Sequence, residues 1–192
     1  MSATQPIRNI QEIEELKNYY YQEKPNLRNY TLICLGMNSA LRISDLLILK
    51  WKDVYHFPKK HFFAHITITE QKTGKENKII LNQSALNALS LYKKSISPPN
   101  PEDYLFPGRN KMLPLSRSQA FRIIKTAGKN LHFETEISCH SLRKTFGYHA
   151  WKSGAQPAAL MNIYNHSSFQ ITKRYLGIDQ DDKDQIFLEV NL

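Results

Sequence analysis

A short β-prone segment interrupts a chain whose apolar residues otherwise recur at helical spacing. Residues 61–71 and 78–82 are rich in β-branched and aromatic side chains. The residues between them read KTGKEN, in which Gly74 and Asn77 favour a turn. This pattern predicts a hairpin, and the periodicity on both sides of it predicts helices. The predicted fold class is therefore mainly α, with one small antiparallel β-sheet after the third helix.

Several of the expected helices carry signals at their ends. Ser116, with Gln119 three residues later, forms a capping-box pattern. Gly154 is expected to terminate a helix, and Pro157 to open the next one. The expected helices span residues 7–24, 27–40, 43–54, 84–95, 116–131, 139–154, 157–166, 167–177 and 184–190, and a proline-rich loop spans residues 97–108.

Length and composition bound the class of protein. A chain of 192 residues, 41% of them hydrophobic, suits a single domain, 1–192, with a real core. No apolar run reaches about 18 residues, so we expect no membrane-spanning helix and no membrane partner. The first residues, MSATQPIRNIQEIEE, lack the apolar core of a signal peptide. Cys34 and Cys139 fit reduced thiols, and we expect a cytoplasmic protein.

The net charge favours a polyanionic partner. The chain has 26 Lys and Arg against 17 Asp and Glu, a balance of +9, and nucleic acid is the usual partner of such proteins. The alternative is a basic protein whose charge only keeps it soluble. Metal-ligand spacing, a glycine-rich phosphate loop and a G-x-S-x-G motif are all missing from the sequence. An enzyme with this sequence is therefore expected to use side chains alone, with no metal and no cofactor.

Two pairs of polar residues at helical spacing could carry chemistry. His140 and Arg143 share a helix face, and together they offer a proton-transfer group and a fork of donors for a phosphate. The alternative is a solvated basic face. Arg42 stands at a helix start, where Asp45 is expected to hold its guanidinium group. The alternative is a surface ion pair worth about a few tenths of a kcal/mol.

Two further motifs contain cationic and aromatic residues. The hairpin tip carries Lys72, Lys75 and Lys78, which could hang over a bound backbone as a cationic finger. The alternative is a polar turn that resists edge aggregation. The stretch HSSFQITKRYLG places His166 nine residues before Tyr175. Taken alone, this tyrosine is a half-buried aromatic residue of an amphipathic helix.

In their order along the chain, these motifs resemble the catalytic domain of the tyrosine recombinases, the phage integrase family. The resemblance extends from about Asn26 to Tyr175 and rests on four motifs taken jointly. The motifs are ALRISDLL with Arg42, EQKTGK with Lys72, CHSLRKTF with His140 and Arg143, and NHSSFQITKRYL with His166 and Tyr175.

The resemblance implies a site-specific recombinase that cuts and rejoins double-stranded DNA without metal or ATP. It implies that Tyr175 attacks a phosphodiester, forms a 3′-phosphotyrosyl link and frees a 5′-hydroxyl. A phenol with a pKa of about 10 needs a base or a positive field to attack, and His140 matches the family position of the base. Lys72 matches the general acid that protonates the leaving oxygen. Lys75 on the same turn remains an alternative for that role.

Three further residues match the family's phosphate-stabilising donors. These are Arg42, Arg143 and His166, which would meet the charge of the pentacoordinate phosphorane. The chain departs from the family before the last of them. It reads Tyr164-Asn165-His166 where leucine-glycine-histidine is usual. Asparagine tolerates left-handed backbone, so we expect this turn to survive.

The resemblance also bears on domain organisation. Most family members carry an N-terminal clamp domain, for which the position of Arg42 leaves no room. The chain is then either a catalytic-domain fragment or a member of a single-domain branch, similar to the recombinases that invert fimbrial promoters. The start MSATQPIRN favours the second. We expect a bacterial or mobile-element origin.

The expected partners are double-stranded DNA and further copies of the chain. We expect a monomer in solution and a homotetramer on DNA. The apolar tail, residues 186–190, either packs on its own domain or docks into a neighbouring protomer. The candidate contacts to DNA phosphates are Lys75, Arg117, Arg122 and Arg174.

Three other functions compete with this one. A type IB topoisomerase uses a similar residue set, but the short chain and the KTGK hairpin favour a recombinase. A non-catalytic DNA-binding regulator of the same fold would be expected to have lost some of the six chemical residues, and all six are filled. A basic helical protein with accidental motifs does not account for their order and spacing. The sequence does not specify the DNA site or distinguish inversion, integration and excision.

Overall fold

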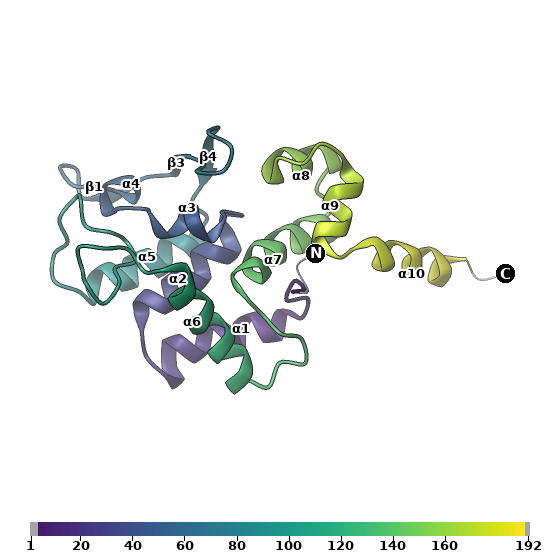
Figure 1. The fold of residues 1–192 in the computed structure, drawn as a ribbon, viewed down its shortest axis with the longest axis horizontal. Helices are drawn as coiled ribbons and strands as arrows, with labels where there is room; N and C mark the ends of the chain where they lie inside the picture. Colours follow the sequence, from purple (N-terminus) through teal and green to yellow (C-terminus); the bar gives the residue numbers. More distant parts are fainter. Residues whose placement is uncertain (1–3, 191–192) are drawn as a thin grey trace.

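The computed structural model describes residues 4–190 and confirms a mainly helical fold with small antiparallel sheets. Figure 1 shows the strands and α1–α7 as one body, with α8, α9 and α10 to one side of it. None of the helices within this part of the chain is long and apolar enough to cross a bilayer.

The described helices follow most of the expected ones. The capping box of Ser116 and Gln119 is present, and Pro157 opens its helix. The helix expected over 7–24 begins at Ile10 and widens into a π-helix, η1. The helices are α1 Ile10–Asn18, η1 Tyr19–Glu23, α2 Leu27–Asn38, α3 Ile43–Leu47, α4 Trp51–Val54, α5 Gln83–Lys94, α6 Arg117–Asn130, α7 Cys139–Lys152, α8 Pro157–Tyr164, α9 Phe169–Leu176 and α10 Asp179–Glu189.

The single helix expected over 43–54 is wrong, because the chain breaks between α3 and α4. Lys50 forms an antiparallel bridge with Tyr104 in the proline-rich loop. Leu49 accepts a backbone hydrogen bond from this loop at 2.7 Å. The Asp53 carboxylate then accepts the backbone N–H of Lys50 at 2.7 Å and starts α4. Long-range backbone pairing has therefore overridden the helical pattern.

The expectation of one sheet is also corrected, because the segment 61–71 divides into two strands. The strand β2, His61–Phe62, turns back to pair with β1, Tyr55–His56. The strand β3, His65–Thr69, forms the expected hairpin with β4, Glu76–Ile80, in a register that places Ile66 opposite Ile79. The predicted turn lies between β3 and β4, with Gly74 at a φ of 67°.

A close approach between helices positions α9. The buried side chains of Tyr164 and Leu176 pack against α7 in the same apolar cluster. Gly147 makes this possible, since a Cβ atom there would lie 2.5 Å from both Tyr164 Oη and Leu176 Cδ2. The helix that carries Tyr175 therefore sits directly on the helix that carries Arg143.

We predict that Gly147→Ala lowers the free energy of unfolding by about 1–3 kcal/mol, the usual cost of overpacking a filled site. Urea denaturation measures it. Ser153→Ala, an exposed change at the end of the same helix, is the control and is expected to stay within about 0.5 kcal/mol of the wild type. A Gly147→Ala protein as stable as that control would contradict the close packing.

Candidate active site

Arg42 is held by Glu70, and not by Asp45 as the sequence suggested. Arg42 is the N-cap residue of α3, and its Nη1 donates to Glu70 Oε2 at 2.5 Å. Asp45 instead accepts the backbone N–H of Gln71 at 3.0 Å. Asp45 therefore connects the hairpin to α3, and Glu70 orients the guanidinium group of Arg42.

Glu70 directly follows β3, and its side chain is buried. Its carboxylate accepts hydrogen bonds from other residues of the hairpin, from Thr73 Oγ1 at 2.9 Å and from Asn77 Nδ2 at 3.3 Å. Burial alone would raise the pKa of Glu70, but the bond from Arg42 and these two bonds outweigh it and lower the pKa overall. The carboxylate therefore stays ionised beside Arg42.

Arg143, from α7, is buried and is held by two residues, Ala40 and Tyr164. Its Nη1 donates to the carbonyl oxygen of Ala40, which follows the last residues of α2 and has a left-handed conformation. Its guanidinium carbon lies 4.7 Å from the centroid of the Tyr164 ring. Tyr164 Oη in turn donates to the backbone carbonyl of Arg143 at 2.7 Å. The fork of Arg143 is thus fixed before any ligand binds.

His166 and Tyr175 face each other across the junction of α8 and α9. Asn165 closes α8 at a φ of 55°, which confirms the expected left-handed turn. The His166 ring stacks on Tyr164, and its centroid lies 5.3 Å from that of Tyr175. Nδ1 of His166 lies 3.1 Å from Thr172 Oγ1. This contact engages Nδ1 and leaves Nε2 as the ring nitrogen available to a ligand.

The electrostatics join these residues into one site. Burial raises the pKa of Tyr175, while the charge of Arg143, its hydrogen bond to the phenol and the charge of Arg42 partly offset this effect. Burial also lowers the pKa of His166, and so do the charges of Arg143, Arg42 and Lys72. The free site therefore holds a protonated phenol and a neutral imidazole in a strongly positive field.

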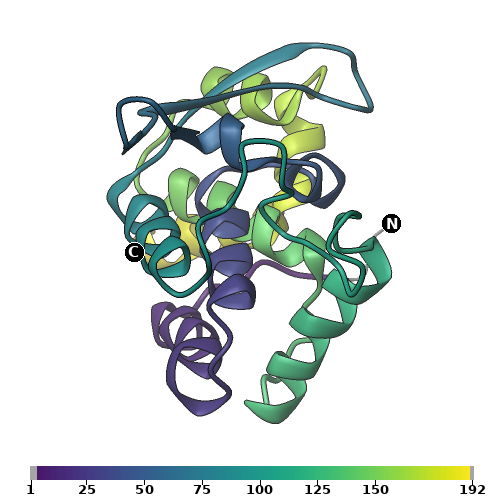
Figure 2. The same ribbon diagram turned by 90° about the vertical axis from the view of Figure 1, so that its left-hand side faces the viewer.

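The hairpin brings Lys72 and Lys75 close to His166. Lys75 Nζ donates to Asn165 Oδ1 at 2.8 Å, next to His166. In Figure 2 the hairpin passes across α8 at the top of the molecule, in agreement with this bond. Lys72 is exposed on the same turn, and its charge reaches His166.

His140 and the remaining expected phosphate contacts, Arg117, Arg122 and Arg174, are exposed. His140 is exposed in the first turn of α7, and its pKa is lowered by desolvation and by the charges of Lys144 and Arg143. Arg174 is exposed on α9 beside Tyr175. Figures 1 and 2 both show α6, which carries the exposed Arg117 and Arg122, away from the hairpin.

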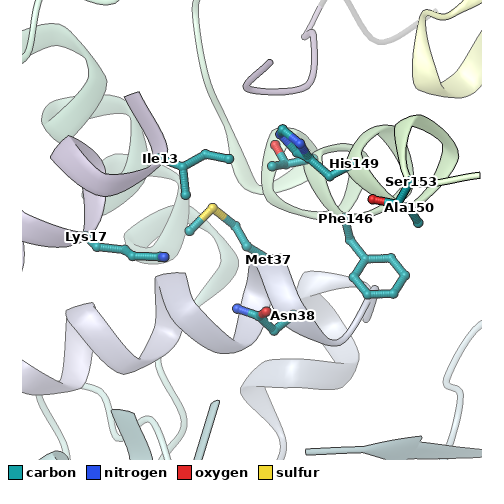
Figure 3. A pocket seen from close by; sticks show the side chains of 9 residues that line it. Ile13, Lys17, Met37, Asn38, Phe146, His149, Ala150 and Ser153 are labelled. Carbon is teal, nitrogen blue, oxygen red and sulfur yellow. The ribbon is translucent and has the colours of Figure 1, made fainter. Parts of the chain in front are cut away.

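A separate cavity lies between α1, α2 and α7. It has a volume of about 290 Å³, and Figure 3 shows Ile13, Met37 and Phe146 among its lining side chains. None of the six predicted catalytic residues lines it. The chemistry-bearing cluster is therefore distinct from this hollow.

Several supporting residues escaped the sequence analysis. Glu70 stands at the turn end of an alternating strand, which could have singled it out as a buried carboxylate. Lys144 directly follows Arg143 in the CHSLRKTF motif. Tyr164 stands out only as a departure from the family pattern, and nothing in the sequence marks Thr172, because the roles of both depend on tertiary packing.

Comparisons with known proteins identify the family of the chain. Residues 9–181 match the phage integrase family. "Probable integrase/recombinase YoeC" of Bacillus subtilis (strain 168) is 43% identical over 181 residues, which cover 94% of this chain and 93% of that protein. "Tyrosine recombinase XerD" of Halalkalibacterium halodurans is 26% identical over 174 residues, covering 88% of this chain and 56% of that one.

Solved structures share the fold. The crystal structure of XerA recombinase superposes with a TM-score of 0.76 at 20% identity, covering 98% of this chain and 65% of that chain. XerH recombinase bound to a palindromic difH substrate gives a TM-score of 0.69 at 18% identity, covering 91% of this chain and 50% of that chain. The match is thus to part of these longer chains.

This chain belongs to the phage integrase family. The family and the enzyme class predicted from the motifs, a tyrosine site-specific recombinase, are confirmed. The roles of the individual residues remain predictions.

We predict that Glu70→Gln lowers the free energy of unfolding at pH 7 by about 1–3 kcal/mol, because it weakens charge-assisted bonds at a buried site. The folded pKa of Glu70 is depressed, so this stabilisation is present above the unfolded pKa of about 4.3 and is lost as pH falls through the folded value. The gap between wild type and variant should therefore narrow below about pH 4.

Urea denaturation at several pH values measures this gap. Glu76→Gln, an exposed change on the same hairpin, is the control and should leave the free energy of unfolding within about 0.5 kcal/mol. A gap between wild type and Glu70→Gln that stays constant from pH 7 to pH 3 would contradict the assigned ion pair.

Proposed function

We propose that this protein cuts and rejoins double-stranded DNA at specific sites, with Tyr175 as the nucleophile. The observation that carries the proposal is the convergence of the buried Arg143 with the half-buried His166 and Tyr175, and Arg42 acts on the same phenol. We also propose that the chain, residues 1–192, acts as one catalytic domain, and that the protein works in the cytoplasm.

The proposed reaction is a transesterification. Tyr175 Oη forms a bond to phosphorus, and the bond from phosphorus to the 5′-oxygen breaks. The phenol proton passes to His140, and Lys72 gives a proton to the leaving 5′-oxygen. Attack by a 5′-hydroxyl on the phosphotyrosine reverses these steps and rejoins the strand, so the number of phosphoester bonds is unchanged.

Preorganised donors would stabilise the phosphorane. Arg42, Arg143 and the Nε2 atom of His166 would contact its non-bridging oxygens, and removal of one such donor typically costs about 10²–10³ in rate. Their supports are already in place, since Glu70 holds Arg42 and the Ala40 carbonyl holds Arg143. The anionic phosphate would also raise the pKa of His166 and turn the neutral ring into a better donor.

The basic surface would supply DNA affinity. A net charge of +9 suits a phosphate backbone, and such binding falls steeply with added salt. The solved XerH structure is itself a complex with a difH substrate. We assign phosphate contacts to Lys75 beside the reacting groups and to Arg174, Arg117 and Arg122 on the outer surface.

The tail supports assembly on DNA. Of the two alternatives, docking into a neighbouring protomer is favoured by the exposure of the tail, since Phe187 is 81% exposed and Leu188 is 83% exposed. Figure 1 shows α10 extending away from the body. We propose that this tail docks into a second copy, and that a monomer in solution becomes a homotetramer on DNA.

The first test uses supercoiled plasmid that carries DNA from around the gene, in EDTA and low salt. We expect wild-type protein to leave a covalent protein–DNA adduct after SDS, and Tyr175→Phe to leave none, because phenylalanine has no hydroxyl to attack with. Tyr21→Phe, an exposed tyrosine, is the control. An adduct of undiminished yield from Tyr175→Phe would refute the assignment, and non-selective nicking would favour a topoisomerase.

The second prediction separates Lys72 from Lys75. Lys72→Ala is expected to slow cleavage by about 10²-fold or more, since general acid catalysis contributes about 10²–10⁴. A substrate with sulfur in place of the 5′-bridging oxygen should restore the rate, because a thiolate leaves without protonation. Lys75→Ala is the matched control. Sulfur rescue of Lys75→Ala and not of Lys72→Ala would move the acid to Lys75.

The third prediction concerns the tail. Phe187→Ser is expected to abolish the pairing of two DNA sites while the covalent adduct at a single site persists. Met112→Ser is the matched control, because both side chains are 81% exposed. Analytical ultracentrifugation of protein–DNA complexes measures the pairing. Undiminished pairing by Phe187→Ser would rule out docking through this residue.

A further inference from the structure

A segment outside the predicted motifs reaches the helix that carries Tyr175. Residues 4–9 form no helix or strand and run between the N-terminus of α1 and the junction of α9 and α10. We call this segment the N-terminal strap. Figure 1 shows the start of the described chain beside α7 and this junction.

The strap is anchored on one face of α7. The backbone N–H of Ile7 donates to Thr145 Oγ1 at 2.9 Å, and the Ile7 carbonyl oxygen lies 3.0 Å from Nε2 of His149. The side chain of Ile7 is 2% exposed and belongs to the cluster beneath α1. Backbone bonds and burial together fix the path of the strap along α7.

Lys144 connects the strap to the ring of Tyr175. Its side chain is buried, and its Nζ donates to the carbonyl oxygen of Thr4 at 2.6 Å. The same Nζ lies 5.2 Å from the centroid of the Tyr175 ring. A buried ammonium group held by the strap thus rests on the aromatic ring of the nucleophile, within the range of a cation–π contact.

Arg8 connects the strap to the end of α9. Its Nη2 donates to the carbonyl oxygen of Gly177, the residue that closes α9, at 2.7 Å. Its Nη1 pairs with Asp181 Oδ1 of α10 at 2.8 Å. Gln5 approaches so closely that a Cβ atom on Gly177 would lie 2.6 Å from Gln5 Oε1. The strap therefore contacts α9 two residues beyond Tyr175.

We propose that the N-terminal strap positions the nucleophile, with Lys144 and Arg8 as positioning residues that hold the Tyr175 ring and the end of α9. This inference rests on the proposed function of Tyr175. The six predicted residues carry out the reaction, whereas the strap fixes the position of the Tyr175 phenol relative to Arg143. Loss of either contact lets the ring move, and displacements of about 1 Å can cost about 10²-fold in rate.

The test follows the Tyr175 ring directly in the free protein. Ring-¹³C-labelled tyrosine is observed by NMR, and Tyr175→Phe identifies the Tyr175 signal. We expect Lys144→Met and Arg8→Met to shift or broaden this signal, and Lys144→Arg to restore it in part. Lys129→Met and Arg109→Met, both exposed and outside the strap, are the matched controls. Arg8 is exposed, so its variant keeps the test valid if Lys144→Met unfolds.

The same variants are then assayed for adduct formation on the plasmid. We expect a rate about 10–10²-fold lower with DNA affinity within about twofold of the wild type. An unchanged Tyr175 signal in both variants would overturn the positioning claim. A shifted signal with a wild-type rate would overturn its bearing on the reaction. A wild-type protein that forms no adduct would instead refute the proposed function, while the NMR result still decides whether the strap holds the ring.

Discussion

The structure depends on holding two guanidinium groups close to one phenol. Arg42 and Arg143 both act on the Tyr175 phenol, and like charges placed together repel each other. The protein solves this problem with different acceptors, since a buried carboxylate holds Arg42 and a backbone carbonyl holds Arg143. Glu70 belongs to the hairpin and Ala40 to the turn that follows α2, so the hairpin and the helical body must both be folded before the two arginines can converge.

The positive field of the site therefore favours the binding of a phosphate. Burial keeps Tyr175 protonated and keeps the imidazole of His166 neutral, so neither group is reactive by itself. A phosphodiester would add negative charge to the field of the two arginines. Its binding would strengthen His166 as a donor and place the phosphorus near the phenol. The binding of the phosphodiester would therefore also activate the site, because both depend on the same electrostatic interaction.

Local signals in the sequence predicted much of this molecule. The Ser116 cap, the Pro157 start and the turn at Gly74 all formed as expected, because each depends on a few neighbouring residues. The expected helix over 43–54 failed because Lys50 pairs with Tyr104, far along the chain. Glu70 replaced Asp45 as the partner of Arg42 for the same reason, and the contact of Lys144 with Thr4 spans 140 residues. Spacing along the chain does not encode such contacts, whereas the resemblance supplied the identity of the site residues.

The most direct test of this account is to identify the protein atom that becomes bonded to DNA. The wild-type adduct is digested with nuclease and protease, and mass spectrometry locates the residual nucleotide on the peptide. We predict a nucleotide linked through its 3′-phosphate to the Tyr175 hydroxyl and to none of the other nine tyrosines of the chain's ten. A nucleotide on Tyr164, on another tyrosine or on a histidine would contradict the central claim.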